Sequence, residues 1–112
     1  MIAADTIEEI LATYCKYGWI LRRVLLTDQT KNKIQDRADR LFGDASIGES
    51  KIDAAWFSRS PAEGGVSWEL RYLGDIPFAL LEKVDENDPD FENILHTVES
   101  RLRETIAAKN EA

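Results

Sequence analysis

Apolar and polar residues follow a helical rhythm at the start of the chain. The apolar positions with three- and four-residue spacing are Ile7, Ile10, Leu11 and Tyr14. Thr6 and Glu9 match a capping box, in which the two residues satisfy each other's backbone N–H groups. Gly18 stands where a glycine commonly follows the last helical residue. The pattern therefore predicts a first helix between Thr6 and Gly18.

The next segments predict a strand, a helix and a loop. Residues 19–26 are bulky and apolar but too few for a free-standing helix, so they indicate a strand, interrupted by Arg22 and Arg23. A narrow apolar stripe predicts a second helix over residues 28–42. The small polar residues 44–51 are typical of a loop.

Strict alternation of apolar and polar residues follows in the middle of the chain. The apolar set is Val66, Trp68, Leu70 and Tyr72, and this period of two is typical of a half-buried strand. Residues 53–60 and 66–73 therefore predict a hairpin. Its turn is predicted at 61–65, where two glycines can adopt positive φ.

Two registers are possible for this hairpin, and they exchange its two neighbouring aromatic residues. A four-residue loop pairs Phe57 with Leu70 and turns Trp56 outward, to the face that carries Glu69 and Arg71. A five-residue loop places Trp56 beside Leu70 and turns Phe57 outward. We expect the four-residue loop, because common type I turns close such loops.

The last third of the chain predicts one more strand and one long helix. Residues 76–84 contain the helix formers Ala, Leu, Glu and Lys, so a helix is one alternative. Because they follow two strands and are short, we interpret them as the third strand of a meander. Asp88 as N-cap and Pro89 at the first helical position open the final helix. Its apolar stripe consists of Phe91, Ile94, Leu95, Val98, Leu102 and Ile106.

This order of elements predicts an α+β fold. We expect a three-strand antiparallel meander plus one further strand, with about three helices packed mainly on one face of the sheet. A chain of 112 residues predicts a single domain over residues 1–112, with residues 109–112 as a frayed tail.

Charge argues against several classes of partner. The net charge is −7, and residues 75–112 carry 10 acids against 4 bases, whereas residues 1–74 carry 11 against 10. Because phosphate neutralisation requires surplus Lys and Arg, nucleic acid is an improbable partner.

The longest apolar run, residues 76–81, is far shorter than the roughly 20 residues of a membrane-spanning helix, so no membrane partner is expected.

The residues that most often carry chemistry are few and scattered. Cys15 is the single cysteine, so no internal disulfide is possible and a reducing cytoplasm is the expected location. The helical pattern places Cys15 at the flank of an apolar stripe, where a small buried side chain is expected. His96, the single histidine, is predicted to face water on the last helix. No metal site, cofactor or catalytic group is predicted, because zinc requires several His or Cys ligands.

The sheet face is the candidate site. A face that carries one spare aromatic residue with arginines and an acid is typical of a protein interface, since Trp and Arg dominate binding hot spots. The predicted partner-binding residues are Trp56, Glu69, Arg71, Arg22 and Arg23.

These residues predict a non-enzymatic module that binds another protein or a second copy of itself. Residues 76–81, apolar on both faces, are the reason to expect a homodimer. One alternative is a small-ligand-binding module with an apolar pocket near Trp19, Trp68 and Tyr72. Another is a small enzyme that uses an acid such as Glu69 or Asp75.

Overall fold

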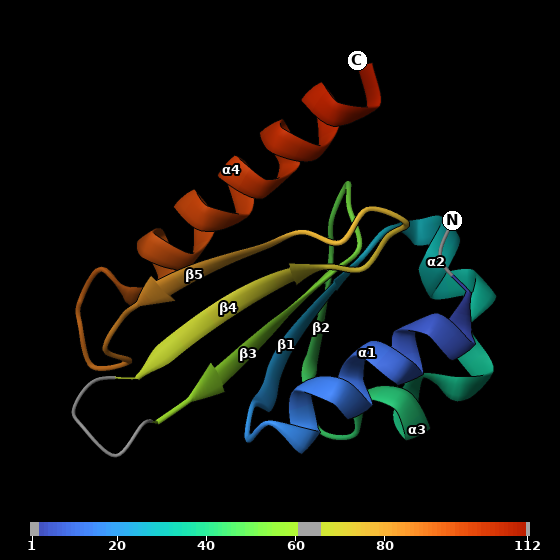
Figure 1. The fold of residues 1–112 in the computed structure, drawn as a ribbon, viewed down its shortest axis with the longest axis horizontal. Coiled ribbons are helices and arrows are strands. Elements are labelled where there is room, and N and C mark those ends of the chain that lie inside the picture. The colour runs from blue at the N-terminus through green and yellow to red at the C-terminus, as the bar shows by residue number, and fades with distance from the viewer. Residues whose placement is uncertain (1–2, 61–65, 112) are drawn as a thin grey trace.

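The computed structural model describes residues 3–60 and 66–111 (Figure 1). Its elements, in chain order, are α1 (Ala4–Lys16), β1 (Ile20–Leu26), α2 (Asp28–Lys33), the 3-10 turn η1 (Gln35–Arg37), α3 (Ala38–Phe42), β2 (Ser46–Glu49), β3 (Ala54–Arg59), β4 (Ser67–Tyr72), β5 (Ala79–Lys83) and α4 (Phe91–Glu111). Among the described helices, none combines the length and the apolar character that crossing a membrane requires.

Five strands form one mixed sheet in the order β2-β1-β3-β4-β5. Strands β3, β4 and β5 are the predicted antiparallel meander, and β1 is the predicted further strand. The predicted α+β fold is therefore confirmed. The loop predicted at residues 44–51 is wrong, because it contains β2, which pairs with β1 in parallel. All four residues of β2 are exposed, so this edge strand has no buried face to produce an alternating pattern.

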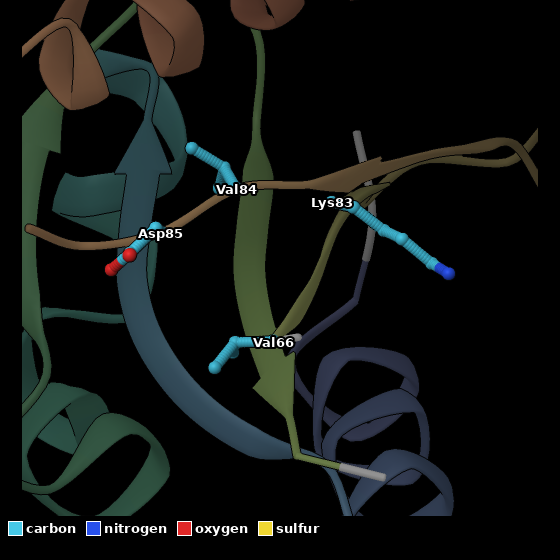
Figure 2. Close-up of a pocket in the computed structure, with 4 residues that line it drawn as sticks. All are labelled: Val66, Lys83, Val84 and Asp85. Carbon is cyan, nitrogen blue, oxygen red and sulfur yellow. The ribbon is translucent and has the colours of Figure 1, made fainter. Parts of the chain in front are cut away.

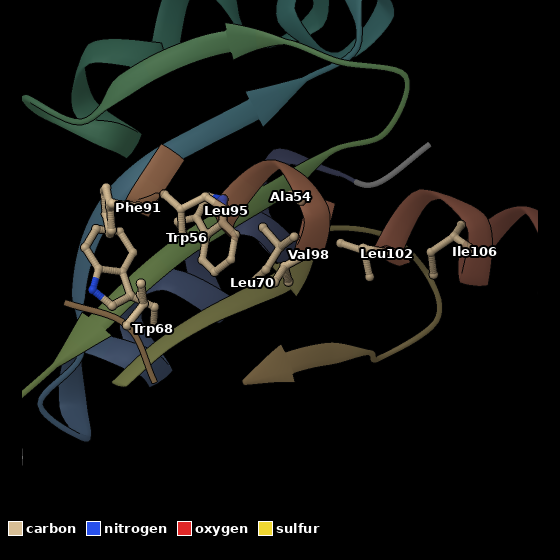
Figure 3. Packing of buried hydrophobic residues seen from close by; sticks show 10 residues of the cluster. Ala54, Trp56, Trp68, Leu70, Phe91, Leu95, Val98, Leu102 and Ile106 are labelled. Carbon is tan, nitrogen blue, oxygen red and sulfur yellow. The ribbon is translucent and has the colours of Figure 1, made fainter. Parts of the chain in front are cut away.

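Helix α4 covers one face of the sheet and builds the first of two cores (Figure 3). Its apolar side packs on Trp56 of β3 and on Trp68 and Leu70 of β4. The residues that α4 contributes are Phe91, Leu95, Val98, Leu102 and Ile106. The predicted apolar stripe of this helix is thus confirmed at five of its positions, while Ile94 is only partly buried against the same core.

The other helices lie across the sheet from α4, as Figure 1 shows. This second core joins Ile7 of α1, Ile34 and Phe42 of the α2–α3 segment, and Phe57 of β3. The short helices therefore share one face, while α4, which was counted among the helices predicted mainly on one face, covers the opposite one. The sheet has helices on both sides.

The register of the β3–β4 hairpin differs from the one expected. Trp56 pairs with Leu70 and Phe57 pairs with Glu69, which is the register of the five-residue loop. Trp56 is 0% exposed and belongs to the α4 core, so its predicted outward position is wrong. Phe57 takes the opposite face, where α1 buries it to 1% exposure. The turn predicted at 61–65 lies outside the described residues.

Helix ends depart from the sequence expectation by a few residues. Helix α1 begins at Ala4 with Ala3 as N-cap and without a side-chain cap, so the predicted capping box at Thr6 is wrong. The second predicted helix is broken by η1 into α2 and α3. Helix α4 begins at Phe91, and Asp88 accepts a hydrogen bond from the Asp90 N–H just before it. The tail predicted to fray remains helical as far as Glu111.

Candidate functional site

The five predicted site residues do not share one surface. Trp56 lies inside the α4 core and donates its indole N–H to the buried carboxylate of Glu99 at 2.8 Å. This bond stabilises the buried indole, because an unsatisfied N–H is costly away from water. Trp56 is therefore not accessible to a partner in this structure.

Arg22 and Arg23 lie at the α4 side of the sheet, where they are occupied by contacts within the chain. The β1–β3 register shifts between Leu21 and Arg23, and the resulting irregularity brings both arginines to the α4 core. The Arg22 guanidinium lies 4.7 Å from the Trp68 ring centroid, and that of Arg23 lies 5.6 Å from the Phe91 ring centroid.

Each of these arginines also makes two hydrogen bonds to one carboxylate. Arg22 binds both oxygens of Glu86 at 2.9 Å, and Arg23 binds Glu92 at 2.7 and 2.6 Å. Hydrogen bonding to these guanidinium groups lowers the pKa of Glu86 and of Glu92 below the ordinary value. The two arginines thus attach β1 to the segment that leads into α4.

Glu69 and Arg71 are brought together, but on the α1 side of the sheet. Glu69 accepts a hydrogen bond from the phenol of Tyr14, whose ring stacks on Phe57 at a centroid distance of 4.0 Å. Burial raises the pKa of Tyr14, the hydrogen bond to Glu69 raises it further, and Arg71 opposes the shift. Arg71 donates to the Tyr72 carbonyl.

The α1-side face of β4 and β5 lacks a helix over it among the described residues. We call this face the open sheet half. Its side chains alternate with those of the α4 core and belong to Ser67, Glu69, Arg71, Ala79, Leu81 and Lys83. Leu81 is 59% exposed at the middle of edge strand β5, directly opposite Glu69. The short helices on this side pack over β1 and β3 instead.

A pocket adjoins the open sheet half at the C-terminal end of α1, where the chain forms a Schellman motif. Gly18 has a φ of +86°, its N–H bonds the Cys15 carbonyl, and the Trp19 N–H bonds the Tyr14 carbonyl. This turn folds Trp19 back toward Tyr14, with ring centroids 6.0 Å apart in an edge-to-face arrangement. The predicted role of Gly18 at the helix end is confirmed.

The pocket has a volume of about 340 Å³, and we call it the Trp19 pocket. It is lined by Thr13, Tyr14, Tyr17, Trp19, Arg59 and Glu69. The Arg59 guanidinium lies 4.7 Å from the Trp19 ring centroid and donates to the Tyr17 carbonyl at 3.2 Å. A second cleft, of about 280 Å³, continues along α1 past Tyr14 to Arg71.

The sequence indicated some of these residues but not their grouping. The grouping in the alternative prediction, an apolar pocket near Trp19, Trp68 and Tyr72, is wrong, because Trp68 lies in the α4 core on the other face. The contact between Trp19 and Tyr14 could have been predicted from Gly18. A glycine at a helix end favours a Schellman motif, which commonly brings the residue after the glycine into apolar contact with the last turn of the helix.

A larger cleft, of about 450 Å³, lies at the ends of β4 and β5. Figure 2 shows that Val66, Val84 and Asp85 point toward one side of these strand ends, while Lys83 points away. Val66 follows directly on the undescribed residues 61–65. The side chains described here are two valines and two opposite charges that point apart, so they do not converge on a ligand.

Metal-binding and nucleophilic residues are not grouped in the described part of the chain. Residues 3–60 and 66–111 contain no cluster of three or more His, Cys, Asp or Glu side chains suited to a metal ion. His96 is exposed on α4 as predicted. Cys15 is exposed as well, so the expectation that it is buried is wrong.

Comparison with known proteins gives no relative of this chain. No family model, no curated protein and no solved structure matches it.

Proposed function

We propose that this protein is a non-enzymatic interaction module that binds another protein through the open sheet half. The observation that carries the proposal is Leu81, which is 59% exposed in the middle of edge strand β5, on a face that no helix of the described residues covers. Apolar surface surrounded by charged groups of both signs is typical of protein interfaces. Glu69, Arg71 and Lys83 supply those charges around Leu81.

The edge of the sheet supports the same proposal. The Tyr72 N–H donates to the Phe78 carbonyl, and the Val84 N–H donates to the Val66 carbonyl. The backbone groups of Phe78 and Val84, which flank β5, therefore point toward β4. Because these groups alternate along an antiparallel strand, those of Ala79, Leu81 and Lys83 point away from the sheet. An extended segment of a partner can add to such an edge, with its side chains reaching the open sheet half.

The partner-binding residues under this proposal are Leu81, Glu69 and Arg71. Glu69 and Arg71 are retained from the sequence prediction, whereas Trp56, Arg22 and Arg23 are engaged inside the chain. The acidic balance of the chain remains the reason to expect a protein partner in preference to nucleic acid. The exposed, unpaired Cys15 thiol supports a location in the reducing cytoplasm.

The first test asks whether the partner is a second copy of the chain. Sedimentation of the purified protein at about tens of micromolar separates the 12.7 kDa monomer from a dimer. We expect Leu81→Lys to abolish a dimer, because it places a charge at the centre of the contact. The matched control is Ile47→Lys, which changes an exposed apolar residue of β2 at the opposite edge of the sheet.

If the wild-type protein is a monomer, the same pair of variants is used as bait in a quantitative pull-down. A specific partner should be retained by wild-type protein and by Ile47→Lys, and lost by Leu81→Lys. The proposal is wrong if both variants retain the same proteins as wild type, because the open sheet half then contributes nothing to binding.

A second candidate function is the binding of a small ligand in the Trp19 pocket. The specific observation in its favour is the convergence of three aromatic side chains with one base and one acid around about 340 Å³. This volume lies near the lower end of the range for ligand sites in proteins.

A further inference from the structure

We propose that the Trp19 pocket binds a small aromatic zwitterion, a molecule with one ring, one carboxylate and one ammonium group in the manner of a free aromatic amino acid. The inference rests on the second candidate function, ligand binding in this pocket, and does not depend on the open sheet half as a protein interface. It rests on the position of Arg59 relative to Glu69 and on the aromatic side chains between α1 and the sheet.

The register separates the two charged residues that line the pocket. Phe57 pairs with Glu69 and Arg59 pairs with Ser67, so Arg59 and Glu69 are diagonal neighbours on the same face of the hairpin. Diagonal positions in an antiparallel pair lie about 7–8 Å apart. Within the described residues, the ion pairs are those of Arg22 and Arg23, and Arg59 and Glu69 do not pair with each other.

Both charged groups retain hydrogen-bonding capacity toward the pocket. Arg59 donates one of its five N–H groups to the Tyr17 carbonyl, which leaves the others for a carboxylate. Glu69 uses one oxygen to accept the Tyr14 phenol, and its second oxygen remains for an ammonium group. A zwitterion uses the remaining hydrogen-bonding capacity of both groups at once, whereas a ligand with a single charge leaves that of one group unused.

The remaining lining specifies an aromatic ring. Tyr17 is 61% exposed at the rim, and Trp19 and Tyr14 meet edge to face at the side of the pocket. Aromatic pairs in offset-stacked or edge-to-face arrangements gain energy beyond the burial of their surface area, and a saturated ring lacks this gain. A volume of about 340 Å³ limits the ligand to roughly one ring with its polar groups.

The experiment titrates the wild-type protein with four probes and follows backbone amide shifts by NMR. The reference probe is phenylalanine. Compared with it, 3-phenylpropionate lacks the amine, phenethylamine lacks the carboxylate, and cyclohexylalanine lacks the aromatic ring. We expect phenylalanine to shift the amides of residues 13–19, 59 and 69. Each single-charge probe should bind about tenfold more weakly, because one charge-assisted hydrogen bond is lost.

Two variants locate the binding, and a third serves as control. Arg59→Gln and Glu69→Gln should each weaken phenylalanine binding about tenfold or more, and the glutamine at 69 keeps an acceptor for Tyr14. Arg40→Gln changes an exposed arginine of α3 and should leave the affinity unchanged. Leu81→Lys should also leave it unchanged, which separates this test from that of the protein interface.

The titration with the four probes requires only the folded wild-type protein, so it tests the proposed ligand class even if a variant is unstable. The proposal is overturned if phenylalanine gives no amide shifts at about 10 mM, a concentration that would largely saturate a site with a Kd of about 1 mM. It is equally overturned if the two single-charge probes bind as tightly as phenylalanine, or if the shifted amides lie away from the pocket.

Discussion

The two faces of the sheet are covered in different ways, and helix length accounts for the difference. Helix α4 has 21 residues and is therefore about 31 Å long, enough to lie across several strands with one continuous apolar side. On the other face, α1 has 13 residues, while α2 and α3 have six and five. These short helices bury the α1-side face of β1 and β3, and among the described residues they leave that face of β5 and most of β4 without a helix over it.

This contrast separates stability from recognition within one sheet. The α4 side holds both buried tryptophans, and its two arginines are fixed by aromatic and carboxylate contacts. The α1 side carries the exposed Leu81, the Trp19 pocket and the paired Glu69 and Tyr14. We infer that substitutions on the first side act mainly on folding, and that those at the uncovered part of the second act mainly on binding.

The largest expected effect concerns two neighbouring residues that face opposite sides. Trp56→Ala should lower the free energy of unfolding by about 3–5 kcal/mol, because it empties a fully buried site and leaves the Glu99 carboxylate without its donor. Phe57→Ala should cost a similar amount, since α1 covers this ring and Tyr14 stacks on it. Urea denaturation curves of both variants provide the measurement.

The control for this pair is Leu81→Ala, on the uncovered part of the sheet. We expect a change within about 0.5 kcal/mol there, as at other exposed positions. If Phe57→Ala proved as mild as Leu81→Ala, α1 would not cover β3 in solution, and the comparison of the two faces would fail.

The second prediction compares the two sides of α4 itself. Leu102 is 0% exposed, so Leu102→Ala should cost about 2–5 kcal/mol. His96 lies on the exposed side, and His96→Ala should change the free energy of unfolding by no more than about 0.5 kcal/mol. Thermal or chemical denaturation that gave equal costs would show that α4 presents a different side to the sheet.

Much of the α4 side was predictable from the sequence, because its information is local. The stripe from Phe91 to Ile106 extends over more than four turns, and the alternation around Trp68 marks which residues of β4 are buried. The assignment of residues 76–84 to a strand is confirmed by β5, which spans Ala79–Lys83.

What could not be predicted depends on contacts between distant segments. The hairpin register is decided by which of Trp56 and Phe57 meets α4, and both are apolar enough for either core. Strand β2 has the sequence SIGE and is exposed throughout, so only its pairing with β1 defines it. The Trp19 pocket joins α1 to β3 and β4, and the local signal for it is Gly18, which lies in the adjoining turn and does not line the pocket.

The third prediction tests the turn that builds the Trp19 pocket. Gly18→Ala should cost about 1–2 kcal/mol, because φ is +86° there and a side chain makes this left-handed conformation unfavourable. Space is not the obstacle, since an added Cβ would lie 3.7 Å from Arg59 Cδ. Denaturation by urea measures the cost.

The matched control for Gly18 is Gly48→Ala in β2. An added Cβ at Gly48 would also lie 3.7 Å from a side-chain carbon, in this case Leu25 Cδ2, but φ is not positive. We expect a change within about 0.5 kcal/mol. Equal costs for the two glycines would contradict the assignment of strain to Gly18.

The smallest expected effect concerns the ion pairs that attach β1 to the start of α4. These pairs are partly exposed, so Glu86→Gln and Glu92→Gln should each cost less than about 1 kcal/mol near neutral pH. Their pKa values are lowered in the folded protein, so the unfolded chain binds protons first as the pH falls. The stability that each pair adds is therefore complete above the ordinary pKa of 4.5 and is lost as the pH falls through the lower folded-state value.

Urea denaturation of wild type and both variants between neutral pH and about pH 2 tests this sign, since the range spans the ordinary carboxyl pKa values. The difference between wild type and each variant should shrink to nothing in acid and should also decrease at high salt, because exposed pairs are screened. Glu104→Gln, on the exposed side of α4, is the control and should show no such dependence. A difference that persisted at the lowest pH would mean that Glu86 and Glu92 stabilise the fold through packing, and that the arginines hold α4 to the sheet by their contacts with Trp68 and Phe91 alone.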